Sequence, residues 1–348
     1  MEHVTLMIDG LEITADKGMS VLEAALQNNI YIPHLCYHPD LEPYGACRLC
    51  MVEVDGRLTI SCRVPADDGL IVETDTPAVN QARRVALELL LVNHPLDCLT
   101  CAQNNNCELQ RAAAYIGVDH GRLGQLRREE LSALQDTSNP FFDFDPNKCV
   151  LCGICVRTCD ELQNIGAIDF SFRGFDTKIS TFASKPWVES KCVSCGECVV
   201  RCPVGALTSK QVQQPAREVK TVCPYCGVGC GVILGVRGDK IVQVRGDREN
   251  PVNRGSLCVK GRFGQSFVNH SDRLTHPLIK ENGSFREATW DEALDTVAQK
   301  LAQIKSTHGP DSLAALTSAK CTNEENYLMQ KLTRAVLGTN NLDHCARL

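Results

Sequence analysis

Nearly all of the cysteines in this sequence stand in four groups whose internal spacings are those of metal ligands. The chain has 348 residues and 21 cysteines, and only Cys321 and Cys345 lie outside the groups. The groups are Cys36, Cys47, Cys50 and Cys62; Cys98, Cys101 and Cys107; Cys149, Cys152, Cys155, Cys159, Cys192, Cys195, Cys198 and Cys202; and Cys223, Cys226, Cys230 and Cys258. Residues 1–10 show no secretory pattern. In a reducing compartment, clustered thiols bind metal or react rather than form disulfides, so we predict a series of metal modules.

The group of eight repeats one motif, C-x2-C-x2-C-x3-C, at 149–159 and again at 192–202. Three thiols on such a loop hold three corners of a 4Fe–4S cluster, and in two-cluster ferredoxins the fourth comes from the other run. The predicted sets are Cys149, Cys152, Cys155 and Cys202 for one cluster, and Cys192, Cys195, Cys198 and Cys159 for the other. Two zinc sites are the alternative, although zinc needs no repeated tandem of four thiols. The first run carries Asp160 where the motif has proline.

The other groups are less specific when they are judged by spacing alone. The four thiols from Cys36 to Cys62 fit either zinc or an iron–sulfur cluster. The group of three needs a fourth ligand, for which His94, Asp97 and His120 are the nearby candidates. A histidine just before a helix-ending proline is ordinarily a cap or a surface residue.

The N-terminal elements have the order of a ubiquitin-like (β-grasp) sheet: a strand pair, a helix, then more strands. Two-residue Asp-Gly turns between alternating apolar residues indicate hairpins, and a serine followed three residues later by glutamate indicates a helix start. The predicted elements are strands 4–8 and 11–13 around Asp9-Gly10, a helix at 21–29 capped by Ser20 and Glu23, and strands 51–54 and 57–62 around Asp55-Gly56.

Helices and short strands are predicted along the rest of the chain. Pro77 starts a helix and Pro95 ends it, and its apolar face is expected at Val85, Leu89 and Val92. The predicted elements are helix 77–93, a spacer at 121–140, a linker at 211–218, strands 232–236 and 241–244, helix 289–305, buried strand 313–316 and helix 322–337. The closing helix–strand–helix order is typical of the start of an α/β domain, in which no second strand can be identified.

The first two groups, in this setting, resemble the N-terminal iron–sulfur domains of the large subunit of respiratory complex I and of iron-only hydrogenases. The resemblance implies a 2Fe–2S cluster on Cys36, Cys47, Cys50 and Cys62. It also implies a 4Fe–4S cluster held by His94 with Cys98, Cys101 and Cys107. A neutral imidazole in place of a thiolate should raise the potential of that cluster.

The last group, C-x2-C-x3-C-x27-C, resembles the N-terminal cluster domain of the molybdopterin oxidoreductases. It implies a further 4Fe–4S cluster on Cys223, Cys226, Cys230 and Cys258. Lys260 then holds the place of a cofactor-binding lysine that passes electrons between cluster and pterin; a solvated loop lysine is the alternative. From residue 219 onward, with 318–326 and 337–348, the resemblance narrows to the catalytic subunits of cytoplasmic molybdenum or tungsten formate dehydrogenases.

We therefore predict a multidomain α+β chain. Its domains are a β-grasp 2Fe–2S domain at 1–78, a helical histidine-ligated 4Fe–4S domain at 79–140, a ferredoxin domain with two 4Fe–4S clusters at 141–212, a 4Fe–4S molybdopterin-oxidoreductase domain at 218–275, and the start of an α/β domain at 276–348.

The resemblance implies an oxidoreductase that interconverts formate and CO2 at a molybdenum or tungsten centre bound by two molybdopterin guanine dinucleotides. Electrons would pass from the Cys223–Cys258 cluster to the ferredoxin pair, the His94 cluster and the 2Fe–2S cluster. Expected partners are a flavoprotein that binds FMN and NAD, small 2Fe–2S subunits, and a hydrogenase or ferredoxin. Alternatives are the large iron–sulfur subunit of a complex I-like NADH dehydrogenase or hydrogenase complex, and a non-catalytic electron carrier.

In that family the residue after Leu348 is the cysteine or selenocysteine that ligates the metal. No catalytic residue is therefore expected within this chain, and the hypotheses are a selenocysteine (UGA) codon after position 348 or a true terminus. The net charge of −6 gives no reason to expect nucleic acid, and no apolar stretch is long enough for a membrane span. A cytoplasmic protein is predicted, with Cys321 and Cys345 as buried structural cysteines.

Overall fold

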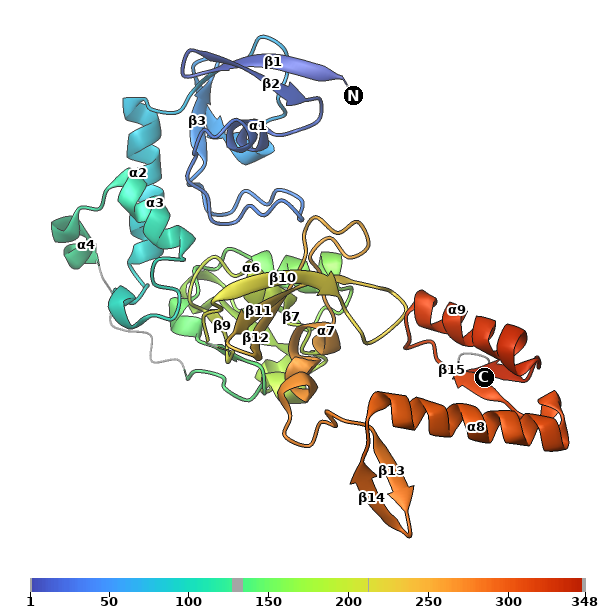
Figure 1. Ribbon diagram of the computed structural model, residues 1–348. Helices are drawn as coiled ribbons and strands as arrows, with labels where there is room; N and C mark the ends of the chain where they lie inside the picture. Colours follow the sequence, from blue (N-terminus) through green and yellow to red (C-terminus); the bar gives the residue numbers. More distant parts are fainter. Residues whose placement is uncertain (1, 127–133, 212, 346–348) are drawn as a thin grey trace. The chain divides into compact units, whose positions relative to one another are not determined.

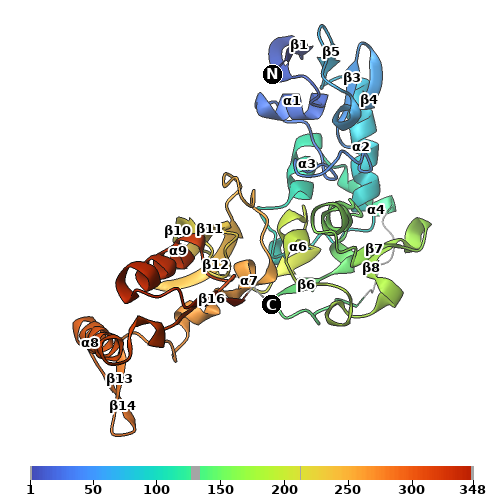
Figure 2. The ribbon, with the colours of Figure 1, turned by 90° about the vertical axis from the view of Figure 1, so that its right-hand side faces the viewer.

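The computed structural model describes residues 2–126, 134–211 and 213–345, and is shown in two views in Figures 1 and 2. The chain divides into two compact units, Met1–Gln211 and Val212–Leu348, which we describe separately. Parts of the predicted 121–140 spacer and 211–218 linker, and the end of the 337–348 motif, lie outside the described residues. In the part of the chain that is described, no helix has the length and apolar character to cross a membrane.

The first unit begins with a five-stranded sheet in the order β2-β1-β5-β3-β4. Its strands are β1 His3–Ile8, β2 Leu11–Asp16, β3 Met51–Val54, β4 Arg57–Ile60 and β5 Ile71–Glu73. β1 pairs with β5 in parallel, and the other pairings are antiparallel. The predicted turns are confirmed, because Asp9-Gly10 and Asp55-Gly56 both have positive φ at each residue. The second hairpin is shorter than predicted, since β4 ends at Ile60 and Cys62 lies in a 3₁₀ turn.

Helix α1, Val21–Gln27, begins with the predicted capping box of Ser20 and Glu23 and packs its apolar residues against the sheet. The helices that follow in this unit are α2 Pro77–Leu91, α3 Glu108–Ile116 and α4 His120–Leu126. The predicted apolar face of α2 is wrong, because Leu89 is 68% exposed. The buried positions are Val79, Arg83, Leu87, Glu88 and Leu91, and all of them except Glu88 repeat every four residues along one face.

The remainder of the first unit carries the eight-cysteine group on two loops and the short helical segments that follow them, beside two small two-stranded sheets. These elements are β6 Phe142–Phe144 paired with β9 Leu207–Ser209, β7 Ile168–Ser171 paired with β8 Lys178–Thr181, and the helices α5 Ile154–Arg157 and α6 Glu197–Arg201. After α5 the chain continues as a π-helix, Thr158–Leu162, whereas α6 stops just before Cys202-Pro203. Asp160, which replaces proline, keeps its backbone N–H and so allows the first helix to continue.

The second unit opens with a three-stranded antiparallel sheet in the order β10-β11-β12. Its strands are β10 Arg217–Val222, β11 Gly231–Arg237 and β12 Lys240–Gly246, followed by helix α7 Val259–Phe263 and the 3₁₀ helix Gly264–Asn269. The two strands predicted at 232–236 and 241–244 are confirmed within β11 and β12.

The rest of the second unit is the start of an α/β arrangement. It contains the hairpin β13 Leu278–Glu281 and β14 Ser284–Glu287, helix α8 Trp290–His308, strand β15 Ala315–Thr317, helix α9 Asn323–Lys331 with a π-helical extension Leu332–Leu337, and strand β16 Leu342–His344. β15 and β16 pair in parallel, so a second strand exists that the sequence did not reveal. The predicted burial of 313–316 holds only at its start, because Leu313 is buried and Leu316 is 82% exposed.

Candidate functional site

The first set of thiols lies at the edge of the β-grasp sheet, where two loops and a 3₁₀ turn meet. Cys36 follows α1, Cys47 and Cys50 lie on the loop before β3, and Cys62 lies in the turn after β4. All four side chains are buried. Gly45 shapes this loop: it has positive φ, and a Cβ there would lie 2.8 Å from Ile60 Cδ1.

The four thiols of this set contact one another in two pairs. A hydrogen bond from the Cys47 thiol lowers the pKa of Cys36 to about 5, and the same contact raises the pKa of Cys47. A hydrogen bond from Cys62 likewise lowers the pKa of Cys50 to about 7. The Cys47 backbone N–H also donates to Cys36 Sγ at 3.4 Å. These contacts place the four buried thiols close together, as a cluster held by four cysteines requires.

The two ferredoxin-like runs fold into loops of the same conformation. Leu151 and Gly153 have positive φ in the first run, and Ser194 and Gly196 have it at the matching places in the second. In each loop a backbone N–H donates to the first sulfur: Leu151 N to Cys149 Sγ at 3.4 Å, and Ser194 N to Cys192 Sγ at 3.3 Å. Backbone N–H groups that point at sulfur are one of the features that tune iron–sulfur clusters.

The fourth thiol of each run lies near the first three thiols of the other run. Burial raises the pKa of Cys149 to about 11, and the negative charge of Cys202 adds to that rise. Burial and then Cys202 also raise the pKa of Cys152. Burial is the main cause that raises the pKa of Cys192, and the negative charge of Cys159 raises it further. The thiols of the second predicted set, Cys159, Cys192, Cys195 and Cys198, line one small cavity.

The histidine-containing group surrounds a cavity of about 130 Å³. Among its lining residues are His94, Cys98, Cys101, Cys107 and Gly205. His94 Nδ1 is buried and has no hydrogen-bond partner among the described residues. Burial lowers the pKa of His94, which favours the neutral imidazole that binds metals.

Gly205 closes this cavity from the ferredoxin-like part of the unit. A Cβ at this position would lie 2.6 Å from Cys101 Sγ, so only glycine fits beside the sulfur as it stands. Of the other candidate ligands, Asp97 also lines the cavity, and the side chain of His120 lies outside the described part. The unpartnered imidazole and the glycine-lined space together fit a bound cluster.

In the second unit the four cysteines of the last group lie where the sheet meets α7. Cys223 follows β10, Cys230 precedes β11, and the Cys223 backbone N–H donates to Cys230 O at 2.8 Å. Cys258 is the N-cap of α7. Burial raises the pKa of Cys230, and Cys223, Cys226 and Cys258 raise it further, so the four thiols are neighbours. Lys260 lies exposed on the first turn of α7.

The two isolated cysteines do not share one environment. Cys321 is half-buried, but Cys345 is exposed, so its prediction as a buried structural residue is wrong. Cys345 Sγ accepts a hydrogen bond from Ala319 N at 3.3 Å. A hydrogen bond from Ser318 lowers the pKa of Cys345.

Across residues 2–126, 134–211 and 213–345, no three His, Cys, Asp or Glu side chains could together hold a single metal ion. A single zinc ion needs its sulfur ligands about 2.3 Å from one point. The ligands of an iron–sulfur cluster bind separate iron atoms of a larger core. A zinc site thus requires its sulfur atoms around one point, whereas an iron–sulfur site requires them around several separate iron atoms.

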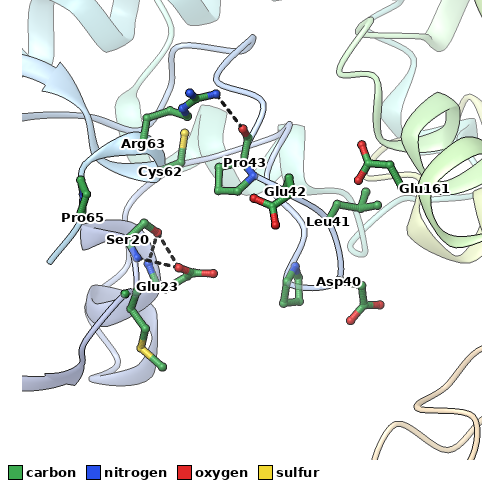
Figure 3. Close-up of a pocket in the computed structure, with 13 residues that line it drawn as sticks. Ser20, Glu23, Asp40, Leu41, Glu42, Pro43, Cys62, Arg63, Pro65 and Glu161 are labelled. Atoms are coloured by element: carbon green, nitrogen blue, oxygen red, sulfur yellow. Dashed lines mark hydrogen bonds between the residues drawn. The ribbon is translucent and has the colours of Figure 1, made fainter. Parts of the chain in front are cut away.

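A larger, polar cavity of about 690 Å³ lies beside Cys62 (Figure 3). Its wall includes Arg63, which donates to Pro43 O at 3.2 Å, and Glu161 from the π-helix of the first ferredoxin-like run. The sequence did not single out the residues that join these two parts. Arg157, between Cys155 and Cys159, donates to Cys36 O at 2.7 Å across 121 residues of chain.

Comparison with known families covers most of the chain. The matches are a 2Fe-2S iron-sulfur cluster binding domain at 1–77, the NADH-ubiquinone oxidoreductase-G iron-sulfur binding region at 83–122, a 4Fe-4S binding domain at 185–208, the molybdopterin oxidoreductase Fe4S4 domain at 216–270 and molybdopterin oxidoreductase at 273–348.

Curated relatives match along the whole chain. The probable oxidoreductase YjgC of Bacillus subtilis strain 168 is 36% identical, and the match covers 99% of this chain and 39% of YjgC. The putative formate dehydrogenase YrhE of the same strain is 36% identical, over 100% of this chain and 40% of YrhE. The putative formate dehydrogenase SAR2393 of Staphylococcus aureus strain MRSA252 is 33% identical, and the match covers 99% of this chain and 39% of SAR2393. The chain therefore spans about two fifths of the length of these relatives.

Among solved structures, the chain is similar to an NAD+-reducing [NiFe]-hydrogenase in the H2-reduced state, with a TM-score of 0.54 and 34% sequence identity. That match covers 60% of this chain and 87% of the hydrogenase chain. The domains named by the family matches are those of a multidomain α+β protein with 2Fe–2S, 4Fe–4S and molybdopterin-oxidoreductase parts. The chain combines N-terminal iron–sulfur domains with the start of a molybdopterin oxidoreductase, and it is similar to the N-terminal part of formate dehydrogenase-like relatives.

Proposed function

We propose that this chain is the iron–sulfur electron-transfer part of a formate dehydrogenase or CO2 reductase. One observation carries the proposal most directly: Cys159 of the first ferredoxin-like run lines one cavity together with Cys192, Cys195 and Cys198 of the second run. That arrangement is the one in which two-cluster ferredoxins hold their clusters. Relatives named as putative formate dehydrogenases along the whole chain support the choice of reaction.

In this proposal the ligand sets and domain boundaries are those of the sequence prediction. Iron–sulfur clusters, when bound, take up and release single electrons, while the protein sets their position and potential. The chain's own contribution is the set of backbone N–H donors at Cys36, Cys149 and Cys192. His94 contributes a neutral ligand, which raises the potential of its site relative to the all-thiolate sites.

Lys260 is proposed as the residue between the last cluster and the pterin. Its place on the first turn of α7, two residues after Cys258, supports this role. The molybdenum or tungsten ion, the two pterin guanine dinucleotides and the cysteine or selenocysteine ligand would be held largely by residues beyond this chain. Formate and CO2 are therefore substrates of the longer protein in this proposal.

A flavoprotein that binds FMN and NAD is the proposed electron-exchange partner, with small 2Fe–2S subunits. Similarity to a chain of an NAD+-reducing hydrogenase over 60% of this chain supports that choice. The same similarity favours a second candidate function, as the iron–sulfur subunit of a hydrogenase complex. The two functions differ in the electron donor, which is formate in one case and H2 in the other.

The test is anaerobic purification of the full-length protein with its bound subunits. We expect about 18 iron atoms per chain, two for the 2Fe–2S cluster and four for each of four 4Fe–4S clusters. Formate, but not H2, should reduce the clusters, as followed by visible absorption and electron paramagnetic resonance (EPR). Zinc in place of iron would refute the cluster assignment, and reduction by H2 alone would favour the hydrogenase complex.

A further inference from the structure

The loop that carries Cys36 is held by two arginines from the ferredoxin-like part of the same unit. Arg157 donates through Nη2 to Cys36 O at 2.7 Å and through Nη1 to Glu42 O at 2.7 Å. Arg201 donates through Nη2 to Asp40 Oδ2 at 2.8 Å. We call the segment 36–47 the 2Fe–2S loop. One arginine comes from each cysteine run, and both reach the same loop.

Arg157 makes the more extensive contact with the 2Fe–2S loop. Its guanidinium also lies over the ring of Tyr44, 5.1 Å from the ring centroid. Two donors of one planar group therefore reach two carbonyl oxygens of the loop while its face covers an aromatic ring. A planar fork of this kind fixes orientation as well as distance, which a single ammonium group cannot do.

Arg201 forms part of a buried charged group. Its side chain is 5% exposed, and it pairs with Glu197, whose side chain is fully buried on the same helix. The second pairing, with Asp40, ties this helix to the 2Fe–2S loop. Buried charges are costly to remove from water, so each needs a partner that is held in a fixed arrangement. Here the arrangement is the docking of one metal-binding segment on another.

The helix that carries Arg157 is shaped by the departure at Asp160. Because there is no proline at this position, α5 continues through the π-helix Thr158–Leu162. Glu161 at its end lines the cavity beside Cys62 (Figure 3). The helical segment of the first run is therefore longer than that of the second run, which ends at Arg201.

The two metal-binding segments are neighbours at the level of their thiols. Cys36 and Cys47 of the proposed 2Fe–2S set lie in the same buried cluster as Cys155 of the proposed 4Fe–4S set. This places the 2Fe–2S set beside the ferredoxin pair directly. The linear order expected from the sequence instead placed the His94 site between them.

We propose that Arg157 and Arg201 are positioning residues that hold the 2Fe–2S loop against the ferredoxin-like helices for direct electron exchange. The inference rests on the proposed function, because it requires both sets to hold clusters. The exchange moves one electron, so one site is oxidised as the other is reduced, and no further reactant is needed. The 4Fe–4S site concerned is the one of Cys149, Cys152, Cys155 and Cys202.

The test compares Arg157→Gln and Asp40→Asn with Arg157→Lys and with the control Arg173→Gln, all in the full-length, cluster-loaded protein. Arg173 is an exposed arginine of the same unit, just after β7. EPR relaxation of the reduced 2Fe–2S signal reports its magnetic interaction with a reduced neighbour. Hydrogen exchange of the amides at 37–46 reports how firmly the loop is held.

In Arg157→Gln we expect the relaxation enhancement to be lost while iron content and each cluster signal remain. Loop exchange should accelerate roughly ten- to hundredfold, as expected for losing a hydrogen bond from a charged donor. Arg157→Lys should restore part of the effect, and Arg173→Gln should behave as the unaltered protein. If Arg157→Gln loses iron, Asp40→Asn and Arg157→Lys decide the question by the same readouts.

Unchanged relaxation and unchanged loop exchange in the iron-replete variants would overturn the inference alone. A missing 2Fe–2S signal in the unaltered protein would instead refute the proposed function. Faster loop exchange with unchanged relaxation would show that the arginines only stabilise the fold, and would also overturn the inference.

Discussion

The Gly205→Ala substitution is a direct test of the site around His94. Gly205 is buried, and its φ is not positive, so alanine meets no backbone strain there. The added Cβ would lie 2.6 Å from Cys101 Sγ. The sulfur must therefore move by about 0.4–0.8 Å to reach the 3.0–3.4 Å range of tight but real contacts.

That displacement is large for a metal ligand. Ligand distances in metal sites hold to within about 0.2 Å, so Cys101 cannot move this far and keep an undistorted bond to the cluster. Overpacking of a buried site costs about 1–3 kcal/mol of folding free energy even without a metal. We expect the variant to fold and to lose or distort this one cluster.

The assay is iron content combined with EPR of the dithionite-reduced protein. Gly205→Ala should lose about four iron atoms per chain and one signal, since a 4Fe–4S cluster holds four. Gly124→Ala is the matched control, because it lies exposed in α4 with nothing within 4 Å of an added Cβ. Full iron and an unchanged set of signals in Gly205→Ala would show that Cys101 does not bind the cluster from this position.

Three further predictions follow from single residues. His94→Cys should keep the iron and lower the midpoint potential of one 4Fe–4S signal, because a thiolate adds negative charge; an unchanged potential would exclude His94 as ligand. Asp160→Pro should lower the free energy of unfolding by about 3 kcal/mol in urea, because proline disrupts a helix interior, whereas Asp160→Ala should not. Burial raises the pKa of Tyr31 to about 12, so its contribution to stability is present below pH 10 and is lost as pH rises towards 12. Tyr31→Phe should remove the tyrosinate absorbance change near pH 12, and no such change in the parent would contradict the burial.

The elements that the sequence predicted well are those specified by neighbouring residues. The Asp9-Gly10 turn needs two residues with positive φ, and the Ser20–Glu23 capping box closes within one helical turn. The cysteine runs are equally local, because three thiols of each set lie on one loop. Only the prediction that the two runs exchange their fourth thiols depended on a rule about the whole ferredoxin fold.

The failures concern residues whose surroundings come from distant parts of the chain. Leu89 is the more apolar residue, yet Arg83 is buried on α2, because its guanidinium donates to Met51 O and Thr74 O. Strand β16 has three residues and no alternating pattern, so only its pairing with β15 reveals it. The need for glycine at position 205 likewise comes from a distant residue, because a Cβ there would lie against Cys101 Sγ.

The two cysteine runs have one spacing and one loop conformation, but they are not equivalent, and one difference between them is the residue after the fourth cysteine. Without proline after Cys159, the first run extends its helix and holds the 2Fe–2S loop through Arg157. With proline after Cys202, the helix of the second run ends at Arg201, and Pro203 O accepts the backbone N–H of Glu108 at 2.9 Å, next to Cys107 of the His94 site. The proposed cluster of Cys149, Cys152, Cys155 and Cys202 therefore borders both the 2Fe–2S site and the His94 site, because it takes ligands from both runs. In the proposed function this cluster is therefore a branch point rather than one member of a single line of carriers.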